Sequence, residues 1–125
     1  MTVPQSVFDL VGEEAIAQLI AAFYQQIPTD PILGPMYPES DWEGAEQRLR
    51  DFLIYRFGGP QRYIEERGHP RLRRRHVKFP IDKAARDRWI ELMNNAFEKV
   101  DIPEPGKLEM KKLFDHVATF LINRQ

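Results

Sequence analysis

Apolar residues recur at steps of three and four along most of this chain, and no segment alternates convincingly at a period of two. Steps of three and four put side chains on one face of a helix, whereas a half-buried strand requires alternation. The sequence therefore predicts an all-α protein with four substantial helices and several short ones.

The apolar stripes and the breakers between them predict where the long helices lie. They are expected at about residues 12–27, from Asp41 to the FGGP sequence at 57–60, across 89–100, and across 110–121. The middle of the chain, residues 57–70, has no clear periodicity and is expected to be irregular. A loop of that length in a small helical protein costs ordering entropy, which a bound ligand or cofactor could offset.

The length and composition favour one soluble domain over residues 1–125. With 18 Lys and Arg against 19 Asp and Glu, the net charge is -1, which argues against nucleic acid or a membrane surface as a partner. The absence of cysteine excludes a disulfide framework, a thiolate metal site and a cysteine nucleophile. The sequence shows neither a signal peptide nor an apolar run of about 18 residues, so a cytoplasmic protein is expected.

The stretch RLRRRHVKFP at residues 71–80 places one histidine among many basic residues. In a helix, Leu72, His76 and Phe79 would share a face, where a lone histidine is more often a hydrogen-bonded core residue than a ligand. This helix is short and lies between breakers, however, so its own packing gives little reason to bury a polar ring. One imidazole nitrogen beside guanidinium groups suits an anionic metal cofactor with a single axial bond, of which haem is the commonest.

Three aromatic residues that carry a polar atom lie on separate segments. Tyr24 belongs to a buried stripe, where its phenol oxygen needs a hydrogen-bond partner, Tyr37 lies in a turn, and Trp89 begins the strongest helical stripe. Each alone is typical of a core aromatic residue, while together they could converge on one small polar ligand. His69 and His116 are weaker candidates, and no H-E-x-x-H, phosphate-loop or nucleophile-elbow motif occurs. Catalysis by an activated side chain therefore has no support.

Several of these segments occur together in one known family. FYQQIPTDPILGPMYPES, GAEQRLRDFL, GGPQRYIEERGHPRLRRRHVKFPI and RDRWIELM follow one another in the order that is typical of it. The chain resembles the truncated haemoglobins, and specifically group II, over residues 6–122. Residues 58–81 are the most specific part of the match. Where members often have a Gly-Gly pair after the first short helix, this chain reads VGEE and keeps only Gly12.

The resemblance implies a truncated globin, a two-over-two helical sandwich around b-type haem. It implies that His76 is the proximal iron ligand, with its other ring N–H held by a backbone carbonyl. Tyr24, Tyr37 and Trp89 match the distal positions. Ala45 falls where ordinary globins often place a distal histidine and cannot donate a hydrogen bond. The remaining residues expected to contact the cofactor are Leu49, Phe52, Leu53, Leu72, Phe79 and Met93, with Arg48, Arg73, Arg75 and Lys78 as candidates to hold the propionates.

For function, the resemblance implies a pentacoordinate haem iron that binds dioxygen, nitric oxide and carbon monoxide. Strong distal hydrogen bonds argue against bulk oxygen transport. They favour oxygen or nitric-oxide redox chemistry, as in a nitric-oxide dioxygenase, peroxidase-like oxidation, or sensing, and the redox uses require an electron-donating reductase. Both a monomer and a homodimer are compatible with the sequence.

The alternative hypothesis is a haem-free helical interaction domain. It would bind an acidic partner through the basic run at residues 71–75, which holds Arg71, Arg73, Arg74 and Arg75. A basic run is usually only a solvated helix face. A carrier of apolar ligands is a third and weaker hypothesis.

Overall fold

The helical periodicity of the sequence is reproduced in the structure, a computed structural model that describes residues 6–37, 41–77 and 79–124, apart from the side chain of Arg75. Within these residues the chain forms helices and no strands, which confirms the all-α prediction. The elements are α1 (Val7–Val11), α2 (Glu13–Tyr24), η1 (Gly34–Met36), α3 (Trp42–Arg56), α4 (Arg62–Arg67), α5 (Leu72–His76), α6 (Lys83–Lys99) and α7 (Glu104–Phe120).

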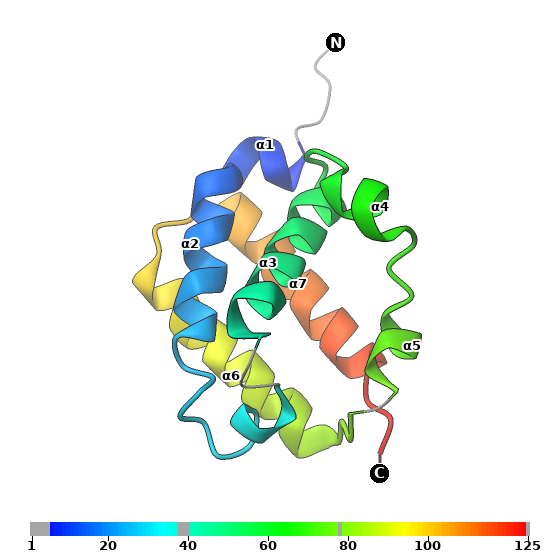
Figure 1. The fold of residues 1–125 in the computed structure, drawn as a ribbon. Helices are drawn as coiled ribbons and strands as arrows, with labels where there is room; N and C mark the ends of the chain where they lie inside the picture. Colours follow the sequence, from blue (N-terminus) through cyan, green and yellow to red (C-terminus); the bar gives the residue numbers. More distant parts are fainter. Residues whose placement is uncertain (1–5, 38–40, 78, 125) are drawn as a thin grey trace.

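The four long helices form two layers, with α2 and α3 packed over α6 and α7 (Figure 1). Helix α2 packs against both α3 and α6, α6 packs against α7, and the short helix α1 lies against α7. The short helices α4 and α5 follow α3 along one side of this sandwich (Figure 1). None of the described helices has both the length and the hydropathy that a membrane crossing requires.

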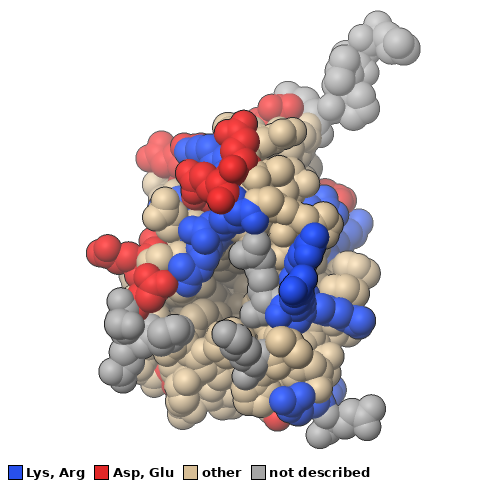
Figure 2. Space-filling model, turned by 45° about the vertical axis from the view of Figure 1, so that its right-hand side comes forward, with Lys and Arg blue, Asp and Glu red and all other residues tan. Residues whose placement is uncertain are grey.

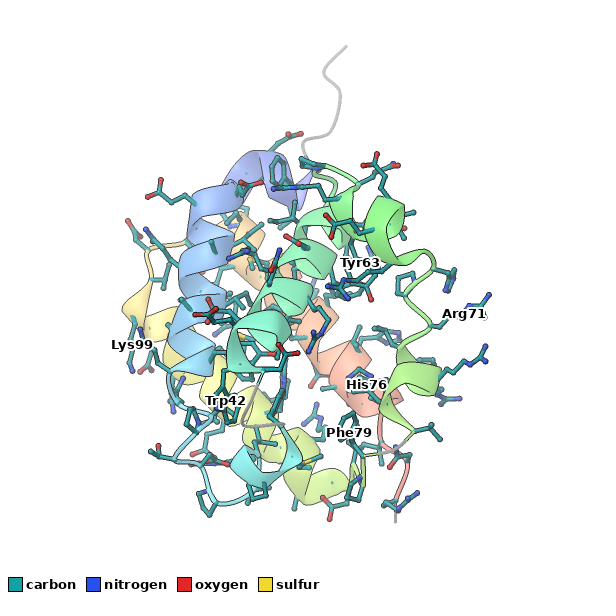
Figure 3. The ribbon with its side chains drawn as sticks, in the orientation of Figure 1. Trp42, Tyr63, Arg71, His76, Phe79 and Lys99 are labelled. Carbon is teal, nitrogen blue, oxygen red and sulfur yellow. The ribbon has the colours of Figure 1, made fainter. Side chains whose placement is uncertain are left out.

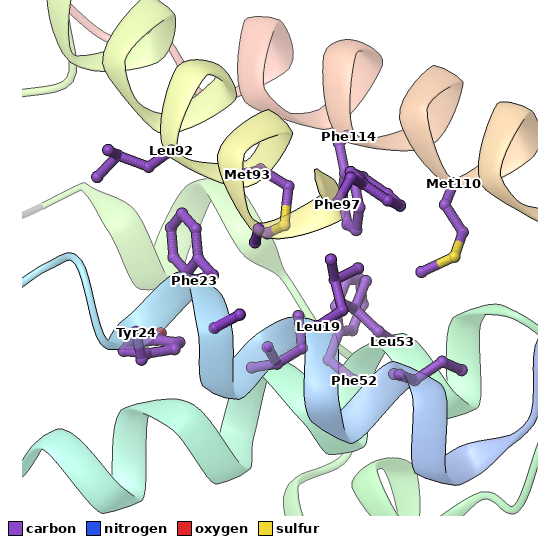
Figure 4. Packing of buried hydrophobic residues seen from close by; sticks show 14 of the residues in the cluster. Leu19, Phe23, Tyr24, Phe52, Leu53, Leu92, Met93, Phe97, Met110 and Phe114 are labelled. Atoms are coloured by element: carbon purple, nitrogen blue, oxygen red, sulfur yellow. The ribbon is translucent and has the colours of Figure 1, made fainter. Parts of the chain in front are cut away.

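The hydrophobic core lies between the two layers (Figure 4). Phe114 of α7 is its centre, with its ring centroid 6.0 Å from that of Phe97, 5.5 Å from Trp89 and 6.3 Å from Phe57. The largest fully buried side chains of the core are Ile16, Leu19, Ile20, Phe23, Ile27, Leu53, Ile54, Met93 and Met110. These residues follow the stripes seen in the sequence, because burying one apolar face of each helix is what holds the layers together.

The predicted irregular stretch at residues 57–70 is only partly irregular, because α4 forms inside it. This helix has six residues, which is too short for a periodic stripe to show. Its anchor is Tyr63, which is 4% exposed and whose ring lies edge-on to Phe52 of α3, at 5.5 Å between centroids. The formation of α4 therefore depends on a tertiary contact rather than on a local sequence pattern.

Three helix boundaries and one cap differ from the prediction. Helix α6 begins at Lys83 and α7 at Glu104, each about two turns before its apolar stripe, because polar first turns carry no such stripe. Helix α2 ends at Tyr24, and hydrogen-bonded turns carry the chain on to the buried Ile27. Asp41 stands at the N-terminus of α3 as predicted, but its side chain forms no capping hydrogen bond and instead pairs with Arg48 at 3.0 Å. Gly12, the remaining glycine of the VGEE sequence, joins α1 to α2 with a φ of 88°, a left-handed conformation that favours glycine.

A buried ion pair fixes the loop between α2 and η1. Asp30 is 5% exposed, and its carboxylate accepts hydrogen bonds from the N–H groups of Ile32 (3.1 Å) and Leu33 (2.8 Å) and from Arg88 Nε (2.6 Å). Burial by itself would raise the pKa of Asp30, but these hydrogen bonds outweigh it and hold that pKa below its usual range. The loop that leads to Tyr37 is thereby tied to α6.

We expect Asp30→Ala to lower the free energy of unfolding by about 2 kcal/mol or more at pH 7, because two backbone N–H groups and Arg88 lose a charged acceptor. A carboxylate whose pKa is lowered in the folded state contributes stability above its unfolded pKa, and this contribution is lost as the pH falls through the folded value. The difference between variant and wild type, measured by urea unfolding, should therefore shrink below about pH 4.

The matched control is Asp87→Ala, which removes a carboxylate of an exposed ion-pair group with Lys83 and Arg86. Exposed ion pairs contribute little to stability, so this control should unfold nearly as the wild type does. Equal losses in the two variants would contradict the role given to Asp30.

Candidate functional site

The imidazole of His76 is held in one orientation by its own helix. Its Nδ1 lies 2.7 Å from the backbone carbonyl oxygen of Leu72, one turn earlier in α5. A carbonyl oxygen only accepts hydrogen bonds, so Nδ1 carries the proton that it donates. In the neutral ring, Nε2 then has no proton and presents a lone pair, which is the form that a metal ion binds.

His76 is half buried, and its side chain points from α5 toward the interior of the molecule (Figure 3). Phe79 lies beside it, with 6.2 Å between the ring centroids and 60° between the ring planes. On the face that carries α3, α4 and α5 the molecular surface is hollowed, and Lys and Arg side chains stand to both sides of the hollow (Figure 2). The imidazole is therefore oriented and directed toward the interior of the molecule.

Tyr24, Tyr37 and Trp89 come together in the structure, and we name them the polar aromatic cluster. They come from the end of α2, from the residue after η1 and from α6. The hydroxyl oxygen of Tyr37 accepts a hydrogen bond from the Tyr24 hydroxyl and another from Trp89, whose indole N–H can only donate. The rings of Tyr24 and Tyr37 meet edge to face, at 5.7 Å between centroids.

Neighbouring aromatic rings fix the positions of the cluster. Phe23 lies 5.0 Å from Trp89 and 5.3 Å from Tyr24, measured between ring centroids. Trp42, at the start of α3, lies 5.9 Å from Tyr37 on the other side. Each member of the cluster is therefore supported by apolar packing as well as by hydrogen bonds.

The electrostatic environment keeps both tyrosine hydroxyls protonated. Burial raises the pKa of Tyr24 well above its ordinary value, and the nearby Tyr37 hydroxyl raises it further. Burial also raises the pKa of Tyr37, against the opposing effect of the two hydrogen bonds that it accepts. At neutral pH both hydroxyls can therefore donate a proton to a hydrogen bond.

The apolar residues expected to contact a cofactor fall into two groups. Ala45, Phe52, Leu53 and Met93 are buried in the core, whereas Leu49, Leu72 and Phe79 are half buried. Met93 is 1% exposed, and Figure 4 shows its side chain directed from α6 toward α2. The assignment of all seven as cofactor contacts stays a prediction.

The basic residues expected to hold propionates have other partners or cannot be placed. Arg48 pairs with Asp41, and Arg73 Nε donates to the backbone carbonyl of Phe120 at 3.2 Å. The side chain of Arg75 and the whole of Lys78 lie outside the described residues. The structure therefore singles out none of the four, and their role stays a prediction.

The other histidines do not join the site. His69 is exposed, and its Nδ1 accepts a hydrogen bond from the backbone N–H of Arg71 at 3.1 Å. His116 is exposed on α7 and lines a surface groove beside Phe57 and Leu113. Among the described residues, no group of three histidines or carboxylates could hold a metal ion. Of the three histidines, His76 is thus the one whose ring is half buried and held by its own helix.

Sequence reasoning missed three residues that bear on the site. Trp42 and Tyr63 pack on Tyr37 and Phe52, and apolar spacing around them could have indicated burial but not these partners. Asn123 contacts the backbone of His76 from the end of the chain, and no sequence signal could have found it. All three depend on contacts between distant segments.

The residues present fit a haem group with one protein ligand. The ring nitrogen of His76 that is not bonded to Leu72 is the kind of donor that binds haem iron. The polar aromatic cluster supplies protonated donors for a small ligand, and the hollow is flanked by basic side chains that suit an acidic cofactor. This chemistry can be compared with that of known proteins.

A family model described as bacterial-like globin matches residues 6–123. A group 2 truncated haemoglobin of Bacillus subtilis is 38% identical over 95 residues, which are 76% of this chain and 71% of that protein. The crystal structure of haemoglobin from Chloroflexus aurantiacus has a TM-score of 0.92 and 38% identity, covering 97% of this chain and 100% of the other. The truncated oxygen-avid haemoglobin of Bacillus subtilis has a TM-score of 0.90 and 32% identity, covering 95% and 100%.

These similarities extend over nearly the whole chain and include both the sequence and the two-over-two arrangement of the helices. They are supported by the oriented His76 and by the polar aromatic cluster. The chain therefore belongs to the bacterial-like globins and, among them, to the group II truncated haemoglobins, a family in which membership implies haem-based binding of diatomic ligands.

Proposed function

We propose that this protein holds b-type haem through His76 and binds dioxygen, nitric oxide or carbon monoxide next to Tyr24, Tyr37 and Trp89. The observation that carries the proposal is the hydrogen bond between His76 Nδ1 and the Leu72 carbonyl, since it leaves Nε2 as a ligand nitrogen in a fixed direction. When bound, haem supplies an iron atom that takes one ligand from the protein and has a further position for a diatomic gas.

His76 provides the single protein ligand in this proposal, which makes the iron pentacoordinate before a gas binds. The Leu72 carbonyl holds the proton on Nδ1 and thereby increases the basicity of the other nitrogen. The half-buried side chains of Leu49, Leu72 and Phe79 can exclude water from the cofactor. Arg48, Arg73, Arg75 and Lys78 stay our candidates for the propionates.

The polar aromatic cluster would hold the gas by hydrogen bonds. Tyr37 accepts two bonds within the cluster, so its own hydroxyl proton is left for another acceptor, such as a bound diatomic ligand. Tyr24 and Trp89 can redirect their single protons from Tyr37 to the ligand. Ala45, being small and apolar, leaves this role to the cluster.

Slow ligand release follows from two or three such hydrogen bonds, and the oxygen avidity of the Bacillus subtilis relative supports it. Slow release suits chemistry on the bound gas better than bulk transport. We therefore propose redox chemistry of oxygen or nitric oxide, such as nitric-oxide dioxygenation or peroxidase-like oxidation, sustained by an electron-donating reductase, or else gas sensing.

The first test is haem binding by His76→Ala. Loss of the axial ligand should abolish the sharp Soret band of the reduced protein and its shift with carbon monoxide, both measured by visible absorption after haemin addition. The matched control, His116→Ala, removes an exposed histidine and should behave as the wild type does. If the folded wild type bound no haem, the proposal would be wrong, and a haem-free protein that binds an acidic partner would become the better hypothesis.

The second test concerns the distal donors. Tyr24→Phe and Trp89→Phe should each speed oxygen release several-fold, because one hydrogen bond of about 1 kcal/mol or more is lost. Stopped-flow displacement of oxygen by carbon monoxide measures this rate. Tyr55→Phe, a hydroxyl deletion on α3 outside the cluster, is the matched control. Unchanged release in both cluster variants would count against the role of these donors.

The third test uses the raised pKa values of Tyr24 and Tyr37. A tyrosine that stays protonated in the folded protein contributes full stability below the unfolded pKa of about 10, and this contribution falls as the pH rises further. Between pH 10 and 11 the loss should be about 1 kcal/mol for Tyr24, whose folded pKa lies far above this range, and Tyr37 should add to it in the same direction. The Tyr24→Phe, Tyr37→Phe double variant should show a correspondingly flatter alkaline decline in urea unfolding. Parallel declines would mean that the hydroxyls ionise normally.

A further inference from the structure

Helix α5 carries His76 but has little helix packing of its own. It is five residues long, and it is not among the described helices that pack extensively against another helix. A helix this short is not stable by itself. The orientation of the imidazole therefore depends on whatever holds the backbone around it.

The segment after α7 supplies that support through Asn123. The amide Nδ2 of Asn123 donates to the carbonyl oxygens of His76 (3.3 Å) and Phe79 (2.9 Å). Its Oδ1 accepts a hydrogen bond from the backbone N–H of Ile81 at 2.9 Å, and its own backbone N–H donates to the Ile81 carbonyl at 2.8 Å. One side chain thus joins the residue that would bind iron to the chain that leads into α6.

These contacts satisfy groups that a helix cannot satisfy itself. The carbonyl groups of the last turn of a helix have no partner within the helix and need one from outside. His76 is the last residue of α5, and its carbonyl accepts the N–H of Phe79 at 3.0 Å and the amide of Asn123, which lies 47 positions later in the sequence. The backbone of His76 is thereby held at its carbonyl, while its ring is held by the Leu72 carbonyl.

A second contact joins the start of α5 to the end of α7. The guanidinium of Arg73 lies over the ring of Phe120 at 4.1 Å, and its Nε donates to the Phe120 carbonyl. Figure 1 shows the C-terminal segment running alongside the end of α5. Helix α5 is therefore attached to the C-terminal segment on both sides of His76.

We propose that Asn123 is a positioning residue for His76, one that sets the direction from which the imidazole meets haem iron. This inference rests on the proposed function, because it concerns the same ligand. Without the amide, the Phe79 carbonyl loses the donor that Asn123 provides, and the His76 carbonyl keeps only the N–H of Phe79, so the segment around the ring gains freedom to turn. When a residue that orients a metal ligand through hydrogen bonds is substituted, the metal affinity typically falls by about 10–100-fold.

The test compares two substitutions of Asn123 that differ in which of its side-chain hydrogen bonds they remove. Asn123→Ala removes all side-chain contacts, whereas Asn123→Asp keeps the acceptor for the Ile81 N–H and loses both donors to the carbonyls. Arg124→Ala is the control, because among the described residues the hydrogen bond that its side chain forms goes to the backbone carbonyl of Asn123 and not to α5. Two quantities are measured on the haem-loaded protein: the rate of haem transfer to apomyoglobin, and the iron–histidine stretching band in the resonance Raman spectrum of the ferrous form.

We expect both Asn123 variants to shift or broaden the iron–histidine band and to lose haem about tenfold faster or more, with Arg124→Ala unchanged. Thermal unfolding of the haem-free proteins gives the purely structural effect. The proposal is overturned if Asn123→Asp behaves as the wild type does, or if haem loss follows the change in stability while the band stays in place. His76→Ala distinguishes a failure of the proposed function from a failure of the positioning role. If His76→Ala retains the wild-type iron–histidine band, His76 is not the iron ligand and the proposed function fails as well. If His76→Ala loses the band while both Asn123 variants behave as the wild type does, only the positioning role is refuted.

Discussion

Trp89 connects the hydrophobic core to the candidate site, and much of the structure depends on its packing. Its ring lies 5.0 Å from Phe23 of α2 and 5.5 Å from Phe114 of α7, so one side chain contacts both layers of the sandwich. Its indole N–H is bonded to the hydroxyl of Tyr37. Because the rings on either side leave the indole little freedom, the direction of that N–H is set by the core.

Two polar side chains, each bonded to a distant segment, hold the residues of the candidate site in place. Asp30 binds Arg88 and two backbone N–H groups, which fixes the loop that carries Tyr37 to the helix that carries Trp89. Asn123 binds the backbone around His76 and so fixes the opposite side. In both cases a short polar side chain binds backbone groups that lie in a loop or at the end of a helix, where regular helical hydrogen bonds are missing.

This arrangement lets a short chain carry both a hydrophobic core and the proposed ligand site. Four long helices bury enough apolar surface to hold the fold and also carry Tyr24 and Trp89, whereas His76 and Tyr37 lie on short or irregular segments at its side. Such segments adapt to a cofactor more readily than a packed helix, but they need separate anchors. Asp30, Tyr63 and Asn123 are those anchors in the described part of the chain.

The sequence by itself determined the four long helices, since each must bury a continuous apolar stripe and the period of that stripe is visible in the residues. The family resemblance implied that a backbone carbonyl holds the ring of His76, and the structure identifies that carbonyl as the one of Leu72. Only the tertiary structure decided that Tyr24, Tyr37 and Trp89 share hydrogen bonds, that Tyr63 holds α4 in place, and that Asn123 reaches back to His76. Those contacts join residues far apart in the chain, and a local pattern carries no information about which distant groups will meet when the layers pack.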